Sequence, residues 1–167
     1  MKNLFLLVVV MFVGLGYTSA QEKKLRAGVS LGYGSDDLNF GIGGDVIYSF
    51  NDVWEVALGF DHFFGDDSPV AEWNSNILDL DARFSFAQAN AWKFYGAAGL
   101  SAVWFNLETK PIISGGTTAS TSESDLGVNV GVGANWALGD FVVNPEIKYT
   151  FVDNGFFRIG VGLQYCF

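Results

Sequence analysis

The last eleven residues of the chain, 157–167, read FRIGVGLQYCF and decide the fold. Apolar side chains stand at every second position of this stretch. The positions between them carry an arginine, two glycines, a glutamine and a cysteine. A period of two places successive side chains on opposite faces of an extended strand. The stretch therefore predicts a β-strand with one apolar face and one polar or small face.

The same alternation recurs along the rest of the chain. The ranges that carry it are 25–33, 40–50, 54–61, 78–86, 92–104, 126–136 and 141–151. Most of these runs have about 9 to 13 residues, near the length of a tilted strand that crosses a bilayer. Aromatic residues lie at the ends of the apolar faces, where interfacial girdles form in membrane barrels. We therefore predict an all-β chain folded as an eight-stranded antiparallel up-and-down transmembrane β-barrel.

The connections between these strands alternate in length. Short turns are expected at 51–53, 88–91 and 138–140, and longer connections at 35–39, 65–76 and 106–124, with 152–155 as a short exception. Transmembrane barrels have short periplasmic turns and longer extracellular loops. This asymmetry predicts that both termini are periplasmic. The Ser/Thr/Gly-rich segment 114–122 is expected to be solvated and mobile.

The first twenty residues have a different composition. Lys2 precedes an apolar run at 4–13 and a group of small residues up to Ala20. This order predicts a secretory signal peptide over 1–20 and an exported domain over 21–167. The chain has 9 Lys plus Arg against 18 Asp plus Glu and a formal charge of -9, which argues against a nucleic-acid partner. Its single cysteine excludes a disulfide framework within the chain.

With these strands and this carboxyl end, the chain resembles the small eight-stranded outer-membrane β-barrel proteins of Gram-negative bacteria, often described as porin-like. The resemblance implies an outer-membrane location and outer-membrane lipid as surroundings. It also implies that the terminal strand is a signal for the barrel-insertion machinery. That signal consists of Ile159, Val161, Leu163, Tyr165 and Phe167. Pro145 departs from a regular strand, because it removes a ladder donor and predicts a bulge or register break.

The face opposite the apolar one is charged. An eight-stranded barrel is just wide enough for side chains to fill its interior. Six acids and five bases are expected to point inward and to pair, because an unpaired buried charge is costly. The expected lumen charge network is Arg26, Asp45, Glu55, Asp61, Asp79, Asp81, Arg83, Lys93, Glu146, Lys148 and Arg158. We interpret it as a polar plug, with a narrow water or ion path as the alternative.

Catalytic and cofactor sites are not expected. His62 is the only histidine, and its place after Phe60 suits an outer-membrane lipid deacylase, but Phe64 stands where such enzymes have serine. The acidic residues lack calcium-loop spacing, and the glycine pairs lie within strands, where no phosphate loop forms. We therefore expect no metal, no cofactor and no enzymatic activity. The sequence predicts a barrel whose surface loops contact an unidentified partner, with a small-solute or ion-conducting porin as the alternative.

Overall fold

The computed structural model describes residues 24–35, 38–67, 71–109 and 119–167. The predicted signal peptide lies outside these residues. The strands are β1 (Leu25–Gly34), β2 (Phe40–Ser49), β3 (Trp54–Asp67), β4 (Ala71–Ala89), β5 (Trp92–Thr109), β6 (Ala119–Leu138), β7 (Phe141–Phe151) and β8 (Phe156–Cys166). In the described part of the chain, no helix is long and apolar enough to cross a membrane.

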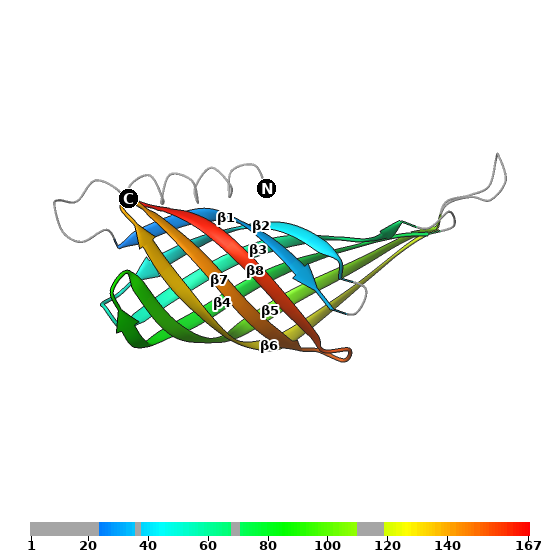
Figure 1. Ribbon diagram of the computed structural model, residues 1–167. Coiled ribbons are helices and arrows are strands. Elements are labelled where there is room, and N and C mark those ends of the chain that lie inside the picture. Colours follow the sequence, from blue (N-terminus) through cyan, green and yellow to red (C-terminus); the bar gives the residue numbers. More distant parts are fainter. Residues whose placement is uncertain (1–23, 36–37, 68–70, 110–118) are drawn as a thin grey trace, which may run out of the picture.

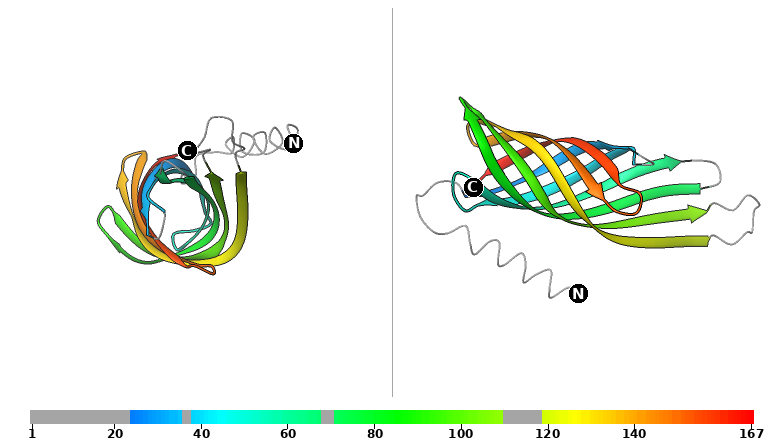
Figure 2. Two further views of the ribbon diagram at one scale, coloured as in Figure 1. Left: turned by 90° about the vertical axis from the view of Figure 1, so that its right-hand side faces the viewer. Right: turned by 90° about the horizontal axis from the view of Figure 1, so that it is seen from below.

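The eight strands form one closed barrel in sequence order, and every neighbouring pair is antiparallel (Figure 1). β8 closes the barrel by pairing with β1, with Arg26 opposite Cys166. The view along the barrel shows the closed ring (Figure 2, left). The predicted fold class, an all-β up-and-down barrel of eight antiparallel strands, is confirmed.

The two ends of the barrel differ. The end that holds the start of β1, the end of β8 and the connections after β2, β4 and β6 is here called the turn end. Two of its turns, at residues 90–91 and 139–140, use a left-handed backbone at Asn90 and Gly139. The opposite end, from which β3 to β6 extend past the β7–β8 turn, is called the projecting end (Figure 1).

The alternation in the sequence separates the two faces of the wall. On β8, Ile159, Val161 and Leu163 are about half exposed on the outside, whereas Arg158 and Gln164 are buried inside. Aromatic rings meet on the outer face near the turn end, where Trp92 stacks on Trp136 with ring centroids 5.4 Å apart. On β8, the apolar residues thus cover the outer wall, and the polar residues point into the lumen.

The predicted strand lengths were wrong for β3 to β6. These strands have 14, 19, 18 and 20 residues, and they take up most of the connections expected at 65–76 and 106–124. The prediction treated polar sequence as loop, but the register continues through it, with Asn74 opposite Asn106 and Phe105 opposite Glu123. Backbone pairing with a neighbouring strand holds a polar segment extended in water. Residues 119–122 of the segment expected to be mobile belong to β6, and 114–118 lie outside the described residues.

Pro145 interrupts a ladder without shifting its register. β6 and β7 pair at Gly133 with Glu146 and again at Trp136 with Val143, and the two pairs between them are missing. The Asn144 amide donates to Ala134 O over 3.0 Å. Since Pro145 has no backbone N–H, this side chain supplies the bond that the backbone cannot. The expected register break is therefore a local gap in hydrogen bonding.

Candidate functional site

The lumen gathers the eleven charged residues predicted to point inward. Ten of them form ion pairs, and all but one of these pairs join strands that are not neighbours in the barrel. The exception, Lys148 with Glu146, lies within β7. Asp45 instead accepts a hydrogen bond of 2.6 Å from Gln164. The charges therefore tie opposite walls of the barrel together.

Glu55 is the centre of the charges nearest the turn end. This carboxylate, 1% exposed, accepts two hydrogen bonds from the Arg26 guanidinium at 2.8 and 3.2 Å. The Lys93 ammonium lies 3.5 Å from the same carboxylate, and the Ser49 hydroxyl donates to it over 3.2 Å. Two cations thus share one buried anion, and β1, β3 and β5 are linked across the lumen.

Arg83 and Glu146 form the next connection. The Arg83 guanidinium donates to Glu146 over 2.8 Å and lies over the Tyr95 ring, 4.8 Å from its centroid. The Tyr95 hydroxyl donates to the same carboxylate oxygen over 2.5 Å and accepts a bond from Asn144. A Cβ at Gly133 would collide with the Tyr95 hydroxyl, so only glycine leaves room for this ring.

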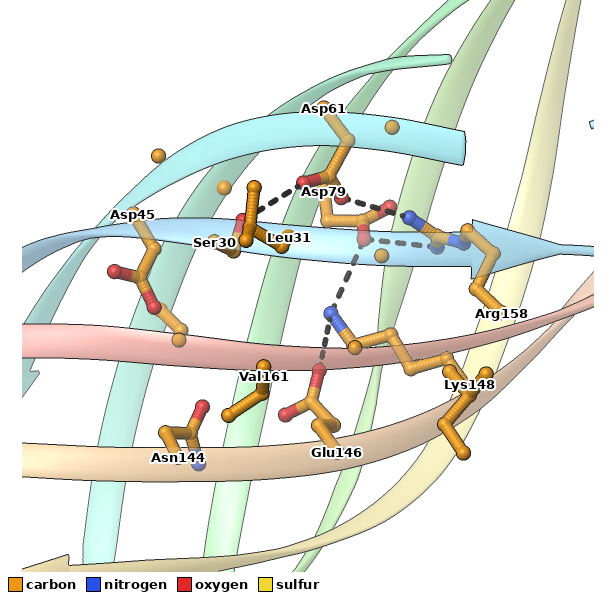
Figure 3. A pocket seen from close by; sticks show the side chains of 18 of the residues that line it. Ser30, Leu31, Asp45, Asp61, Asp79, Asn144, Glu146, Lys148, Arg158 and Val161 are labelled. Carbon is orange, nitrogen blue, oxygen red and sulfur yellow. Dashed lines mark hydrogen bonds and ion pairs between the residues drawn. The ribbon is translucent and has the colours of Figure 1, made fainter. Parts of the chain in front are cut away.

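Asp79 is the hub of the largest cluster, which lies toward the projecting end (Figure 3). Its carboxylate contacts the Arg158 guanidinium at 2.9 Å and the Lys148 ammonium at 3.1 Å. Lys148 also lies 2.5 Å from Asp81, and Arg158 lies 3.2 Å from Asp61. Each buried charge in this cluster therefore faces an opposite charge, which is the arrangement that offsets desolvation.

Neutral side chains also bond to Asp79 and Arg158. Ser101 and Asn129 both donate to Asp79 Oδ1, at 2.5 and 3.3 Å. Arg158 donates to the Thr150 hydroxyl over 3.1 Å. These neutral residues were not among the predicted site residues. The available signal was that Ser101, Asn129 and Thr150 stand at inward positions of their strands, beside inward charges.

A cavity of about 80 Å³ remains beside these clusters, on the side where inward glycines line the wall. Space of this size admits a few water molecules. Asp45 Oδ1, Asp81 Oδ1 and Arg83 Nη1 are buried there without a protein hydrogen-bond partner. Water in the cavity would satisfy these atoms, and the volume is that of a small internal pocket.

An apolar cluster, here called the cap, lies inside the barrel toward the projecting end. It comprises Leu38, Phe63, Ile77, Val103 and Phe156, each at most 3% exposed. Four of these residues stand one inward position beyond Asp61, Asp79, Ser101 and Arg158 on their strands, and Leu38 comes from the β1–β2 connection. The cap was not predicted, because its residues are apolar on a face expected to be charged and because several of them lie outside the predicted strand ranges.

The residues of the predicted insertion signal all lie on the outer face of β8 or at its end. Ile159, Val161, Leu163 and Tyr165 are exposed, and Phe167 is 61% exposed. The Phe167 backbone N–H donates to Leu25 O over 2.9 Å, and its ring packs on Tyr165. The last residue therefore adds a bond to the β1–β8 seam but buries little of its side chain.

His62 also lies on the outer face. Its Nδ1 is 2.9 Å from Asn76 Oδ1, and its ring packs edge-on against Phe64. The histidine is thus held by an amide and an aromatic ring. Within the described residues, no group of three or more His, Cys, Asp or Glu side chains could hold a metal ion.

A closed eight-stranded barrel with an apolar outer wall and a charged lumen is the architecture of a small outer-membrane protein. The chain belongs to the outer membrane protein beta-barrel domain family, whose sequence profile matches residues 5–167. The protein is therefore an outer-membrane β-barrel protein.

Solved structures show the same fold. Neisserial surface protein A aligns with a TM-score of 0.65 and 17% identity, covering 86% of this chain and 96% of its own. A major outer membrane protein from Thermus thermophilus gives 0.65 and 14%, covering 86% and 99%. The attachment invasion locus protein Ail of Yersinia pestis gives 0.56 and 18%, covering 84% and 96%. A search of curated proteins found no match.

Proposed function

We propose that this chain is a non-enzymatic outer-membrane protein whose lumen is closed and whose projecting end is an interaction surface. The observation that carries the proposal is the combination of cross-lumen ion pairs with the cap. A conducting pore needs a continuous column of water, whereas this lumen holds paired charges and then apolar side chains that exclude water. The barrel then acts as a scaffold that outer-membrane lipid surrounds.

The orientation follows from the lengths of the connections. The turn end has connections of two to four residues, at 50–53, 90–91 and 139–140, and the projecting end carries the long strands β3 to β6. In membrane barrels the short turns are periplasmic and the longer segments are extracellular. We therefore place both termini in the periplasm and the projecting end outside the cell.

The projecting strands support a role in surface interaction. β3 to β6 continue beyond the cap as a sheet. This sheet is not needed to enclose the lumen, because in this proposal the cap already closes the barrel below it. Ail, which shares the fold, is described by its name as an attachment invasion protein. A polyanionic partner fits this chain poorly, since the exposed side chains at this end include Glu123 and Asp153.

The second candidate is a small-solute or ion-conducting porin, and the cavity of about 80 Å³ favours it. The two candidates differ in a swelling assay on liposomes that carry the refolded protein. We expect no swelling in solutions of small neutral sugars, as for liposomes without protein. A swelling rate that falls with increasing solute size would establish a porin and overturn the closed lumen.

The non-enzymatic part of the proposal rests on His62, whose ring nitrogen meets an amide oxygen of Asn76 rather than a carboxylate and a serine. The protein in vesicles of radiolabelled outer-membrane lipid should release no fatty acid above a protein-free background. Release that His62→Ala abolishes would assign a lipid hydrolase instead.

A further inference from the structure

One edge of β6 is free over the part of the strand that projects. β6 pairs with β5 from Ala119, opposite Thr109, to Trp136, opposite Trp92. It pairs with β7 only from Val128, opposite Phe151. Among the described residues, no strand pairs with residues 119–127 on that second side. Every second residue there directs its backbone N–H and C=O away from β5.

The free edge has few of the features that protect sheet edges. Natural edges carry lysine, proline or a bulge, or they are covered by another segment. The sequence ASTSESDLG at 119–127 has no lysine or proline, and the β5–β6 register runs through it without a shift. A Cβ at Gly127 would collide with Phe151 O and Val152, so the β7–β8 turn ends against this residue. As far as the described residues go, the edge is therefore open from Ala119 to Leu126, roughly 27 Å of extended chain.

The two faces of this segment have different chemistry. Glu123 and Asp125 share the face that continues to buried Asn129, whereas Ser124 and Leu126 lie on the other face. Glu123 is exposed, and Leu126 is 87% exposed. A strand added at the edge would place alternate side chains beside the two carboxylates and the rest beside Leu126 and the serines.

We propose that the free edge of β6 binds an extended segment of a partner protein by strand addition, with basic residues at alternate positions of that segment. Backbone hydrogen bonds supply the affinity, and Glu123 and Asp125 select the basic side chains. A second copy of the chain fits less well, because it would bring no basic residue to Glu123 and Asp125, and self-pairing centred on Ser124 would set these two carboxylates opposite each other. The proposal rests on the proposed function only in placing this end outside the cell.

The binding test uses the refolded protein in nanodiscs and synthetic eight-residue peptides. The first peptide alternates lysine with valine, the second alternates glutamate with valine, and the third is the lysine peptide N-methylated at alternate residues. Two versions of the third peptide, methylated at odd or at even positions, cover both directions of the backbone. We expect titration calorimetry to detect binding of the lysine peptide, no binding of the glutamate peptide, and loss of binding for one methylated version.

Charge reversal separates recognition from general attraction. Glu123→Lys together with Asp125→Lys should weaken binding of the lysine peptide about tenfold or more. The control Asp153→Lys, also exposed at this end, should change affinity much less. Equal affinity of both methylated peptides, or equal weakening by Asp153→Lys, would show non-specific charge attraction and overturn the proposal. Self-association of the free protein through residues 119–127 would also overturn it.

A separate assay tests the orientation. Thr121→Cys in a Cys166→Ser background should react with a membrane-impermeant maleimide on intact cells. Labelling only after permeabilisation would contradict the orientation while leaving the peptide results intact. Peptide failure with surface labelling would reject strand addition and leave the proposed scaffold role standing.

Discussion

Arg83 shows how a charge is kept inside an eight-stranded barrel. Its guanidinium has an ion pair with Glu146 and a ring contact with Tyr95, and the side chain is 3% exposed. The sequence predicted that this residue points inward, because it is adjacent to Phe84, which belongs to the apolar outer face of the strand. The sequence did not predict its partner, because the partner depends on how far the strands are sheared around the barrel.

Replacing Arg83 by Met should destabilise the folded protein by about 3–5 kcal/mol, because Glu146 would lose its principal counter-charge in a buried setting. Hydration from the adjoining cavity would reduce this figure. Lys24→Met is the matched control, since Lys24 is exposed before β1 and its loss should leave stability almost unchanged. Urea unfolding in lipid vesicles compares both variants with wild type. Coinciding midpoints for all three proteins would mean that the lumen is fully hydrated.

Deleting Phe167 should impair assembly much more than stability. The mutation removes one backbone bond, to Leu25 O, and a ring that is mostly exposed. The hypothesis that this residue is read by the insertion machinery comes from the resemblance of the terminal strand. Quantifying the protein in outer-membrane fractions should show a large loss, while refolded protein keeps nearly the wild-type urea midpoint. Wild-type amounts of the deletion variant in the outer membrane would contradict a role of Phe167 in insertion.

At the scale of the strand, β7 combines a proline with a compensating amide. Ala134 O is the acceptor that a backbone N–H at position 145 would reach, and Asn144 bonds to it instead. The sequence predicted a defect at Pro145 from the missing donor. The repair could not be predicted, because it depends on the rotamer of Asn144 and on the facing atom of β6.

Asn144→Ala should therefore cost about 1–3 kcal/mol, since Ala134 O loses its donor inside the wall. The same substitution should cost less in a Pro145→Val background, where the backbone N–H is restored. The double-mutant cycle is measured by urea unfolding. The Asn144 amide also donates to Asn135 Oδ1 over 3.0 Å. Identical losses in both backgrounds would show that Asn144 stabilises the barrel only through its bonds to Tyr95 and Asn135.

Strand length was predictable only where apolar alternation marked it. The outer face of β8 could be assigned residue by residue, because each apolar position meets the hydrophobic surroundings of the barrel. The ends of β3 to β6 project beyond the cap, where polar residues such as Asn74 and Asn106 interrupt the apolar outer face and the period of two is lost. Pairing with the neighbouring strand holds these segments, and single-sequence periodicity does not report pairing.

At the scale of the whole molecule, the sequence predicted the strand count and the closed antiparallel order, because both follow from eight amphipathic runs joined alternately by short turns and longer loops. Predicting the cap would require knowing which inward positions of different strands lie at the same height along the barrel axis. Phe63, Ile77 and Phe156 come from three strands and meet only after the strands are staggered around the barrel. The inward charges could be predicted from the alternation of side chains along each strand. Which of them lie together at one height depends on how the strands are staggered around the barrel.

The closed barrel predicts heat-modifiable migration in gel electrophoresis. All eight strands are paired around the ring, so detergent meets no open edge within the wall. Unboiled samples from the outer-membrane fraction should migrate differently from boiled samples. One band position before and after boiling, with recovery in the soluble periplasm, would contradict a membrane barrel.

Single-channel recording in planar bilayers tests the closed lumen most directly. The Arg158 and Lys148 side chains converge on Asp79 (Figure 3), and the cap residues Ile77 and Phe156 stand one inward position beyond Asp79 and Arg158. We predict that refolded wild-type protein adds no discrete conductance to the bilayer at moderate voltage and salt. Stable, reproducible openings that scale with protein concentration would contradict the closed lumen and establish an ion-conducting porin.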